Sequence, residues 1–92
     1  MEKTNFITQS LSQRSAQQIF DEAFAPNTYR TPRSEAYKAG VLAALQHHID
    51  RAELVQPFEW GTPAADAWSA GVVEGNALFA REQMLNFGAT DR

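Results

Sequence analysis

Two stretches of the chain repeat each other at a constant offset of 31 residues. Residues 26–41 read PNTYRTPRSEAYKAGV, and residues 57–72 read PFEWGTPAADAWSAGV. Both contain a Pro, a Thr-Pro pair, an Ala and a final Ala-Gly-Val at matching places, and both carry Tyr or Trp at two further matching places. We interpret this gap-free agreement as an internal duplication. Two similar units that fit against each other are therefore the first requirement on the fold.

The shared pattern predicts that each copy is an aromatic-bearing loop followed by a capped helix. Thr31 and Thr62 each stand where a hydroxyl can accept hydrogen bonds from the first backbone N–H groups of a helix. Pro32 and Pro63 would then occupy the first helical position, where a missing N–H is not needed. We therefore expect the two helices to begin at these prolines.

The ends of these two helices follow from residues that interrupt a helix. The first should run from 32 to about 53, because Gln56 precedes a proline and is pushed out of helical geometry. The second should run from 63 to about 87, with Gly88 as a left-handed C-terminal cap.

A further helix is expected over residues 11–25. Its start can be capped by Ser10 with Gln13, or by Ser12 alone. Its apolar residues follow the i, i+3, i+4, i+7 rule of a single helix face; they are Ala16, Ile19, Phe20, Ala23 and Phe24.

Small residues recur every four positions in both repeated helices. The two matching stripes are Ala36, Gly40 and Ala44 in the first helix, and Ala67, Gly71 and Gly75 in the second. A Gly inside a helix is less favourable than Ala by up to about 1 kcal/mol, so its presence needs a compensating gain. We expect that gain from close packing of the two helices through these stripes.

The predicted fold class is all-α, because no stretch alternates with a period of two over a useful length. We expect a single domain over 1–92 that forms a small helical bundle. Its parts are an N-terminal arm (1–9), a helix (11–25), repeat unit one (26–56) and repeat unit two (57–92). Leu, Ile, Val and Phe together number 19, so the core should be thin.

Several kinds of chemistry are excluded by the residues present. There is no Cys, which rules out a thiolate zinc site and cysteine catalysis. His47 and His48 are adjacent, so on a helix they point about 100° apart and cannot both ligate one metal. No nucleophile elbow and no phosphate-binding glycine loop occurs. We expect no enzymatic activity, no metal, no cofactor and no small-molecule substrate.

The predicted location is the cytoplasm of a bacterial host. The absence of Cys fits a reducing compartment. No apolar run approaches the roughly 18 residues of a membrane span, and the first ten residues lack the apolar stretch of a signal peptide. We expect no membrane partner.

Charge is divided unevenly along the chain, whose net charge is −3. Residues 1–38 carry a net +1 and residues 39–92 a net −4. Arg30, Arg33 and Lys38 surround the expected start of the second helix. They could bind a phosphate of nucleic acid there, or they could pair with Glu35 and with carboxylates of the acidic half. We favour pairing, and both interpretations stay open.

Three aromatic rings lie on the Pro-rich loops. Tyr29, Phe58 and Trp60 either cover the ends of the bundle or anchor a partner protein. We favour packing for Trp60, whereas Tyr29 beside Arg30 fits both roles equally. The candidate partner-binding residues are Tyr29, Arg30, Arg33, Lys38, Phe58, Glu59 and Trp60, with Asp66, Glu74 and Phe6 as further candidates.

A resemblance to a known family is carried by three segments. Residues 36–40 (AYKAG), the pair Pro57-Phe58 and residues 66–75 (DAWSAGVVEG) together resemble the ribosome modulation factor family, over about residues 34–76. The resemblance implies an all-α module that docks on the ribosome, contacts ribosomal RNA and protein, and performs no catalysis. That family is strongly basic, whereas the second repeated helix is acidic here.

Two functions are therefore expected in competition. The favoured one is a non-enzymatic binding protein that inhibits or modulates a large host nucleoprotein complex by stoichiometric occlusion. The chain looks like small helical accessory proteins of bacteriophages and mobile elements, which include anti-CRISPR proteins. Arg30, Arg33 and Lys38 could then add a minor contact to RNA or DNA. The alternative is a ribosome modulation factor-like protein that binds ribosomal RNA and protein.

Overall fold

A computed structural model describes residues 14–26 and 28–91 of the chain. The helices are α2 (Ala16–Ala23), α3 (Glu35–Asp50) and α4 (Pro63–Asp91). No strand occurs in the described part, so the all-α prediction is confirmed. The predicted arm over 1–9 lies outside the described residues, as do positions 11–13 of the predicted first helix.

Helix α2 begins later than predicted, at a different cap. Ser15 is the N-cap: its Oγ accepts from the Gln18 N–H at 3.1 Å, and the Ser15 N–H donates to Gln18 Oε1 at 2.9 Å. This reciprocal pair is a capping box. Ser15 therefore caps α2 in place of the predicted Ser10 or Ser12, which lie outside the described residues. The helix ends at Ala23 rather than at residue 25.

Helix α3 is shorter than predicted at both ends. Ser34, not Thr31, is its N-cap and accepts from the Tyr37 N–H at 3.1 Å. The prediction of a start at Pro32 is therefore wrong. At the other end Arg51 adopts a left-handed conformation with φ of 64°, and the Ala52 N–H bonds back to the Gln46 carbonyl at 3.2 Å. This closure ends α3 at Asp50 instead of about residue 53.

Helix α4 begins where the sequence predicts and ends later. Thr62 Oγ1 accepts from the Ala65 N–H at 3.1 Å, and Pro63 is the first helical residue. The helix then continues through Gly88 to Asp91, so the prediction that Gly88 caps it is wrong. The two repeated units therefore share their helices but not their caps.

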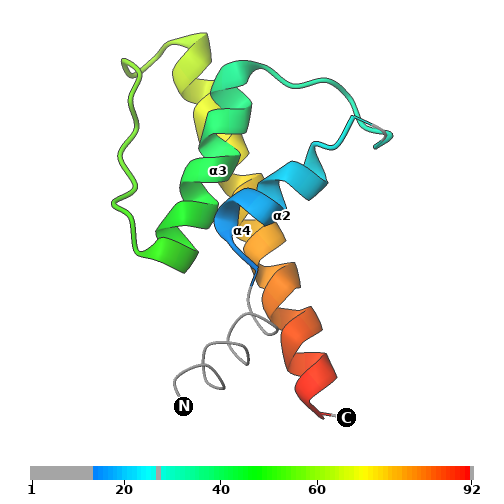
Figure 1. The fold of residues 1–92 in the computed structure, drawn as a ribbon. Coiled ribbons are helices and arrows are strands. Elements are labelled where there is room, and N and C mark those ends of the chain that lie inside the picture. Colours follow the sequence, from blue (N-terminus) through cyan, green and yellow to red (C-terminus); the bar gives the residue numbers. More distant parts are fainter. Residues whose placement is uncertain (1–13, 27, 92) are drawn as a thin grey trace.

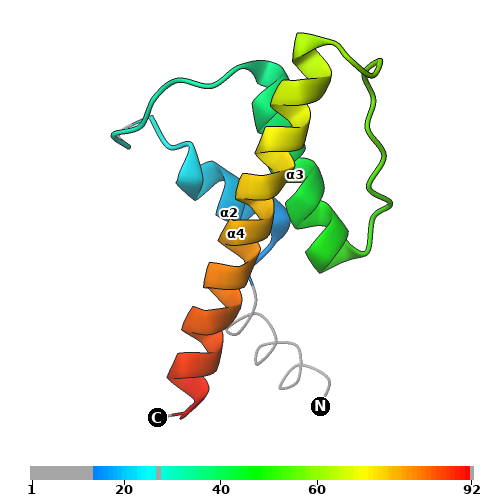
Figure 2. The same ribbon diagram turned by 180° about the vertical axis from the view of Figure 1, so that it is seen from behind.

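The chain runs in the same direction along α3 and α4, which lie side by side (Figures 1 and 2). Parallel neighbours need a long return connection, and residues 51–62 provide it along one side of the pair. Helix α2 and the loop that follows it lie on the other side. Ala16 and Ile19 of α2 join the core of Tyr37, Val41 and Leu45 from α3.

Glycines bring α3 and α4 into backbone contact. A Cβ added at Gly40 would stand 2.1 Å from the Trp68 carbonyl oxygen, and one added at Gly71 would stand 2.0 Å from the Tyr37 carbonyl oxygen. A Cβ at Gly75 would stand 2.6 Å from the Ala44 Cβ. No side chain fits at these distances, so the prediction of close packing through Gly40 and Gly71 is confirmed.

These contacts repeat the offset of 31 residues found in the sequence. Gly40 meets Trp68 and Gly71 meets Tyr37, and each of these pairs becomes the other when the copies are exchanged. Residues at the same place in the two copies also touch: Ala44 lies against Gly75, and the rings of His48 and Phe79 stack with centroids 4.6 Å apart. The helix pair therefore has an approximate two-fold relation. The duplication itself and the likeness of the two loops stay predictions.

Replacing Gly71 by Ala tests the close contact. Intrinsic helix propensity alone would make Gly71→Ala stabilising by about 1 kcal/mol. The added Cβ meets main-chain atoms that cannot turn away, so we expect a net loss of about 1–3 kcal/mol. The free energy of unfolding in urea measures the change. Ala70→Leu, at an exposed neighbour, is the control and should change stability little; a more stable Gly71→Ala protein would contradict the packing argument.

Candidate partner-binding surfaces

The predicted partner-binding residues fall on two separate surfaces. The loop over 24–34 and the connection over 51–62 lie on opposite sides of the α3–α4 pair (Figures 1 and 2). Tyr29, Arg30 and Arg33 belong to the first segment, and Lys38 follows in α3; Phe58, Glu59 and Trp60 belong to the second. The structure therefore does not bring these residues together into one site.

The two loop aromatics project into solvent. Tyr29 is 104% exposed and Trp60 is 81% exposed, each relative to its reference surface. The preference for packing of Trp60 is therefore wrong. Phe58 is half-buried. Single exposed apolar residues are common, but a whole tryptophan ring left in water at a loop tip is typical of a contact for a partner.

A tight turn presents Trp60. Thr62 Oγ1 donates to the Glu59 carbonyl at 2.7 Å, and the Thr62 N–H reaches the same oxygen at 3.4 Å. Gly61 adopts φ of 85°, a region that residues with a side chain rarely occupy. The Phe58 N–H also donates to the Gln56 side-chain oxygen. The ring of Trp60 therefore stands on a turn held by hydrogen bonds within residues 56–62.

Arg30 is engaged by the fold rather than left for a partner. Its guanidinium donates to both carboxylate oxygens of Glu74 at 2.9 and 3.0 Å and to the Ala23 carbonyl at 2.9 Å. The same group lies 4.1 Å from the centre of the Phe24 ring. The predicted pairing of this basic group with the acidic half is confirmed for Arg30. The Glu74 carboxylate, a candidate partner contact, is occupied by the same pair.

Tyr37 completes this cluster. Its hydroxyl donates to Glu74 Oε1 at 2.5 Å, and the ring is buried against α4. The hydrogen bond to Glu74, then burial and the negative charge of that carboxylate, raise the pKa of Tyr37 above its usual value. Glu74 thus holds both the loop, through Arg30, and α3, through Tyr37.

Arg33 and Lys38 remain near the surface. Lys38 Nζ pairs with Glu35 at 3.1 Å, as the pairing interpretation predicts. Arg33 is exposed, and its guanidinium lies 4.5 Å from the centre of the Tyr37 ring. No ion pair to Arg33 occurs within 14–26 and 28–91. A shallow pocket of about 220 Å³ opens beside them, lined by Phe24, Ala25, Thr28, Arg30, Thr31, Pro32, Arg33 and Lys38.

The acidic candidates on the other side are exposed. Glu59 precedes Trp60, and Asp66 lies in the first turn of α4. Neither carboxylate forms an ion pair with another described residue. The segment that carries Tyr29 therefore also carries the exposed cation Arg33, whereas the segment with Trp60 is flanked by the exposed carboxylates Glu59 and Asp66.

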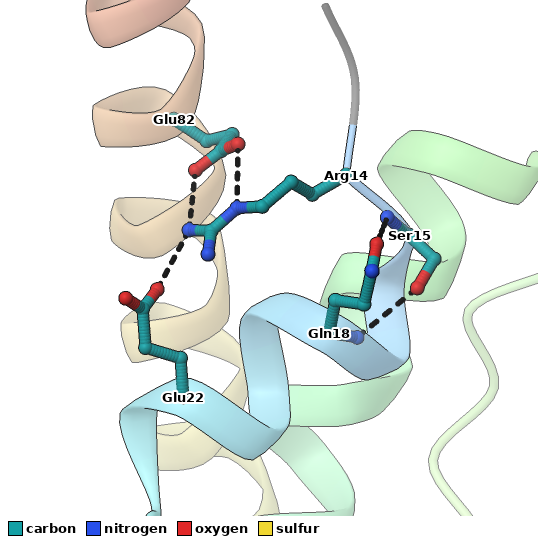
Figure 3. Close-up of polar contacts among 5 residues, drawn as sticks. All are labelled: Arg14, Ser15, Gln18, Glu22 and Glu82. Carbon is teal, nitrogen blue, oxygen red and sulfur yellow. Dashed lines mark hydrogen bonds and ion pairs between the residues drawn. The ribbon is translucent and has the colours of Figure 1, made fainter. Parts of the chain in front are cut away.

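Sequence reasoning missed the cluster around Arg14 (Figure 3). Arg14 donates to both oxygens of Glu82 at 2.9 and 3.0 Å and pairs with Glu22 at 2.7 Å. Glu82 is only 6% exposed although it is charged. Because 68 residues separate Arg14 from Glu82, no local pattern in the sequence could have identified the pair. It ties the start of α2 to α4 beside an open groove of about 440 Å³ between these helices.

Further findings concern metals, membranes and relatives. Within the described ranges, no three His, Cys, Asp or Glu side chains lie close enough to hold a metal ion. None of the described helices is both long enough and apolar enough to cross a membrane. Comparison with protein-family models, with curated proteins and with solved structures finds no match to this chain.

The raised pKa of Tyr37 predicts loss of stability at alkaline pH. Because the pKa of Tyr37 is higher in the folded than in the unfolded protein, the protonated hydroxyl contributes its full stabilisation at any pH below the unfolded-state pKa of about 10. That stabilisation is lost as the pH rises through the pKa of Tyr37 in the folded protein. The free energy of unfolding of the wild type should therefore fall above about pH 10.

Tyr37→Phe separates this effect from general alkaline unfolding. The variant lacks a hydrogen bond to a carboxylate and should be less stable at neutral pH by about 1.5–3 kcal/mol. The difference between wild type and variant should shrink as the pH rises past the titration of Tyr37. Urea unfolding at a series of pH values measures it. A difference that stays constant to high pH would show that the hydroxyl does not contribute in this way.

Proposed function

We propose that this protein is a non-catalytic binding protein that docks on a large nucleoprotein complex of its host and modulates that complex by occupying part of its surface. Bacteriophage accessory proteins such as anti-CRISPR proteins act in this manner. The observation that supports the proposal best is the high exposure of Tyr29 and Trp60 on loops that are held by hydrogen bonds. Aromatic anchors of this kind dominate the affinity of protein interfaces.

The size of the chain is adequate for this role. A specific interface needs about 800 Å² from each partner, and the protein has an accessible surface of 6844 Å². The loops are held by Arg30 on one side and by the Thr62–Glu59 turn on the other. Binding would therefore require little ordering of the loops, which preserves affinity.

Substitution of the aromatic rings tests the proposal. Tyr29→Ala and Trp60→Ala should each reduce capture of the target complex from a bacterial lysate, because a truncated anchor typically weakens binding by about 2 kcal/mol or more. Both variants should unfold at the wild-type urea concentration, since the rings contact solvent. Val73→Ala, which truncates another exposed apolar side chain, on α4, is the control and should bind normally.

Titration of the captured complex distinguishes occlusion from catalysis. The activity of the target should fall linearly to an end point near one or a few copies of the protein for each complex. Inactivation at much lower ratios, or a covalent change in the target, would contradict the proposal. Normal capture by both aromatic variants would show that the contact surface lies elsewhere.

A ribosome modulation factor-like role is the second candidate, and the exposed charge of Arg33 favours it. Contacts to phosphate give an affinity that falls by about one log unit per neutralised charge for each tenfold rise in salt. If the protein acts through RNA, binding to purified ribosomes should follow this slope, and Arg33→Gln should reduce the slope by about one. Salt-insensitive binding to a non-ribosomal complex would contradict this second role.

A further inference from the structure

The two loop tips are equivalent in position and opposite in charge. Tyr29 and Trp60 occupy the same place in the two copies of the repeat. The helices that carry them are related by the reciprocal contacts of Gly40 and Gly71. The approximate two-fold relation therefore places one exposed ring on each side of the α3–α4 pair, and the figures show the two segments on opposite sides (Figures 1 and 2).

The unpaired charges of the two segments do not follow the two-fold relation. On the first side Arg33 is an exposed cation, whereas Lys38 is paired with Glu35 and Arg30 with Glu74. We call Tyr29 and Arg33 the basic loop surface. On the second side Glu59 and Asp66 are exposed carboxylates, and none of the ion pairs of the described chain involves them. We call Glu59, Trp60 and Asp66 the acidic loop surface.

We propose that the protein associates head to tail with further copies of itself, the basic loop surface of one copy docking on the acidic loop surface of the next. The occupant of each surface is then a second copy of this chain. Three observations favour it: the unpaired charges are opposite in sign, each segment carries one largely exposed ring, and the two segments lie on opposite sides of the α3–α4 pair.

The geometry determines the kind of assembly. Contact between unlike surfaces is heterologous, so each added copy leaves one basic and one acidic loop surface free. The association therefore continues beyond a dimer unless the copies close into a cyclic oligomer. Few charges form each contact and they are exposed, so the contact is weak and is screened by salt. A host complex that binds Tyr29 or Trp60 would compete with this self-association.

The wild-type protein alone provides the first measurement. Sedimentation velocity should show a mean mass that rises with concentration from the micromolar to the millimolar range at about 0.01 M salt, and a monomer at about 1 M salt. A monomer under every condition would overturn the proposal. So would a mass that stops at the dimer, because that is the sign of contact between like surfaces.

Two charge reversals provide the decisive measurement. Arg33→Glu should remove the basic loop surface and Glu59→Arg the acidic one, so each variant alone should sediment as a monomer. An equimolar mixture should associate again with the two variants alternating, because the Glu59→Arg copy keeps Arg33, the Arg33→Glu copy keeps Glu59, and the two reversed charges are themselves opposite. Lack of association in the mixture would overturn the proposal.

Arg81→Glu is the matched control, because Arg81 is exposed on α4 and lies beside the groove between α2 and α4. This variant changes the net charge as Arg33→Glu does and should still associate. Loss of association in the control would overturn the assignment to the loop surfaces. Helical circular dichroism confirms that each variant is folded. No host complex enters these measurements, so their outcome is independent of the proposed function.

Discussion

Backbone contact between α3 and α4 is the constraint on which the rest of the structure depends. Gly40 and Gly71 allow each helix to approach the carbonyl of an aromatic residue on the other, Trp68 or Tyr37, at distances that exclude any side chain. At this separation the rings of Tyr37 and Trp68 are buried beside the contact, at 9% and 7% exposure. A chain with few large apolar residues thereby obtains a closely packed interface without a thick core. The unfavourable helix propensity of glycine is offset by contacts along both helices.

The short helix α2 is held by charge as much as by its apolar face. An isolated helix of 8 residues is unstable in water. Ile19 and Ala16 supply the apolar contact, and the arginines before and after the helix both reach α4. Arg14 contacts Glu82, and Arg30 contacts Glu74, so the two ion pairs lie about two turns apart on the same helix. Both pairs are partly buried. Arg14 binds Glu82 through two nitrogens, the bidentate geometry in which an arginine–carboxylate pair is strongest, whereas Arg30 reaches both oxygens of Glu74 through one nitrogen.

Predictions from the sequence were correct where the deciding interaction is local in the sequence, or where it requires an unusual residue such as a glycine inside a helix. Thr62-Pro63 starts α4 because the cap needs only the next three residues. Gly71 indicated close packing because an interior glycine needs compensation. The same reasoning failed at Thr31-Pro32: Arg30 turns back to Ala23 and Glu74, and the chain stays extended until Ser34 caps α3. That pairing spans 44 residues and is invisible in a local pattern. The exposure of Trp60 also could not be foreseen, because it depends on whether any other element covers the turn.

Inward positions and loop positions of the two repeat copies differ in how similar their residues are. Inward positions of the repeat keep similar residues: Gly40 and Gly71 each lie against main chain of the other copy, and Tyr37 and Trp68 are both buried aromatic residues. The loop positions just before the helices differ instead: Arg30 corresponds to Gly61, and Arg33 corresponds to Ala64. Arg30 fixes its loop by reaching across to α4, whereas Gly61 fixes the other by permitting a tight turn. These two ways of holding a loop leave one exposed ring in each segment, and the unpaired charges of the two segments are opposite in sign. If the segments arose by duplication, helix packing would have kept the inward glycine and aromatic positions alike, while the charges of the exposed loops were free to become opposite.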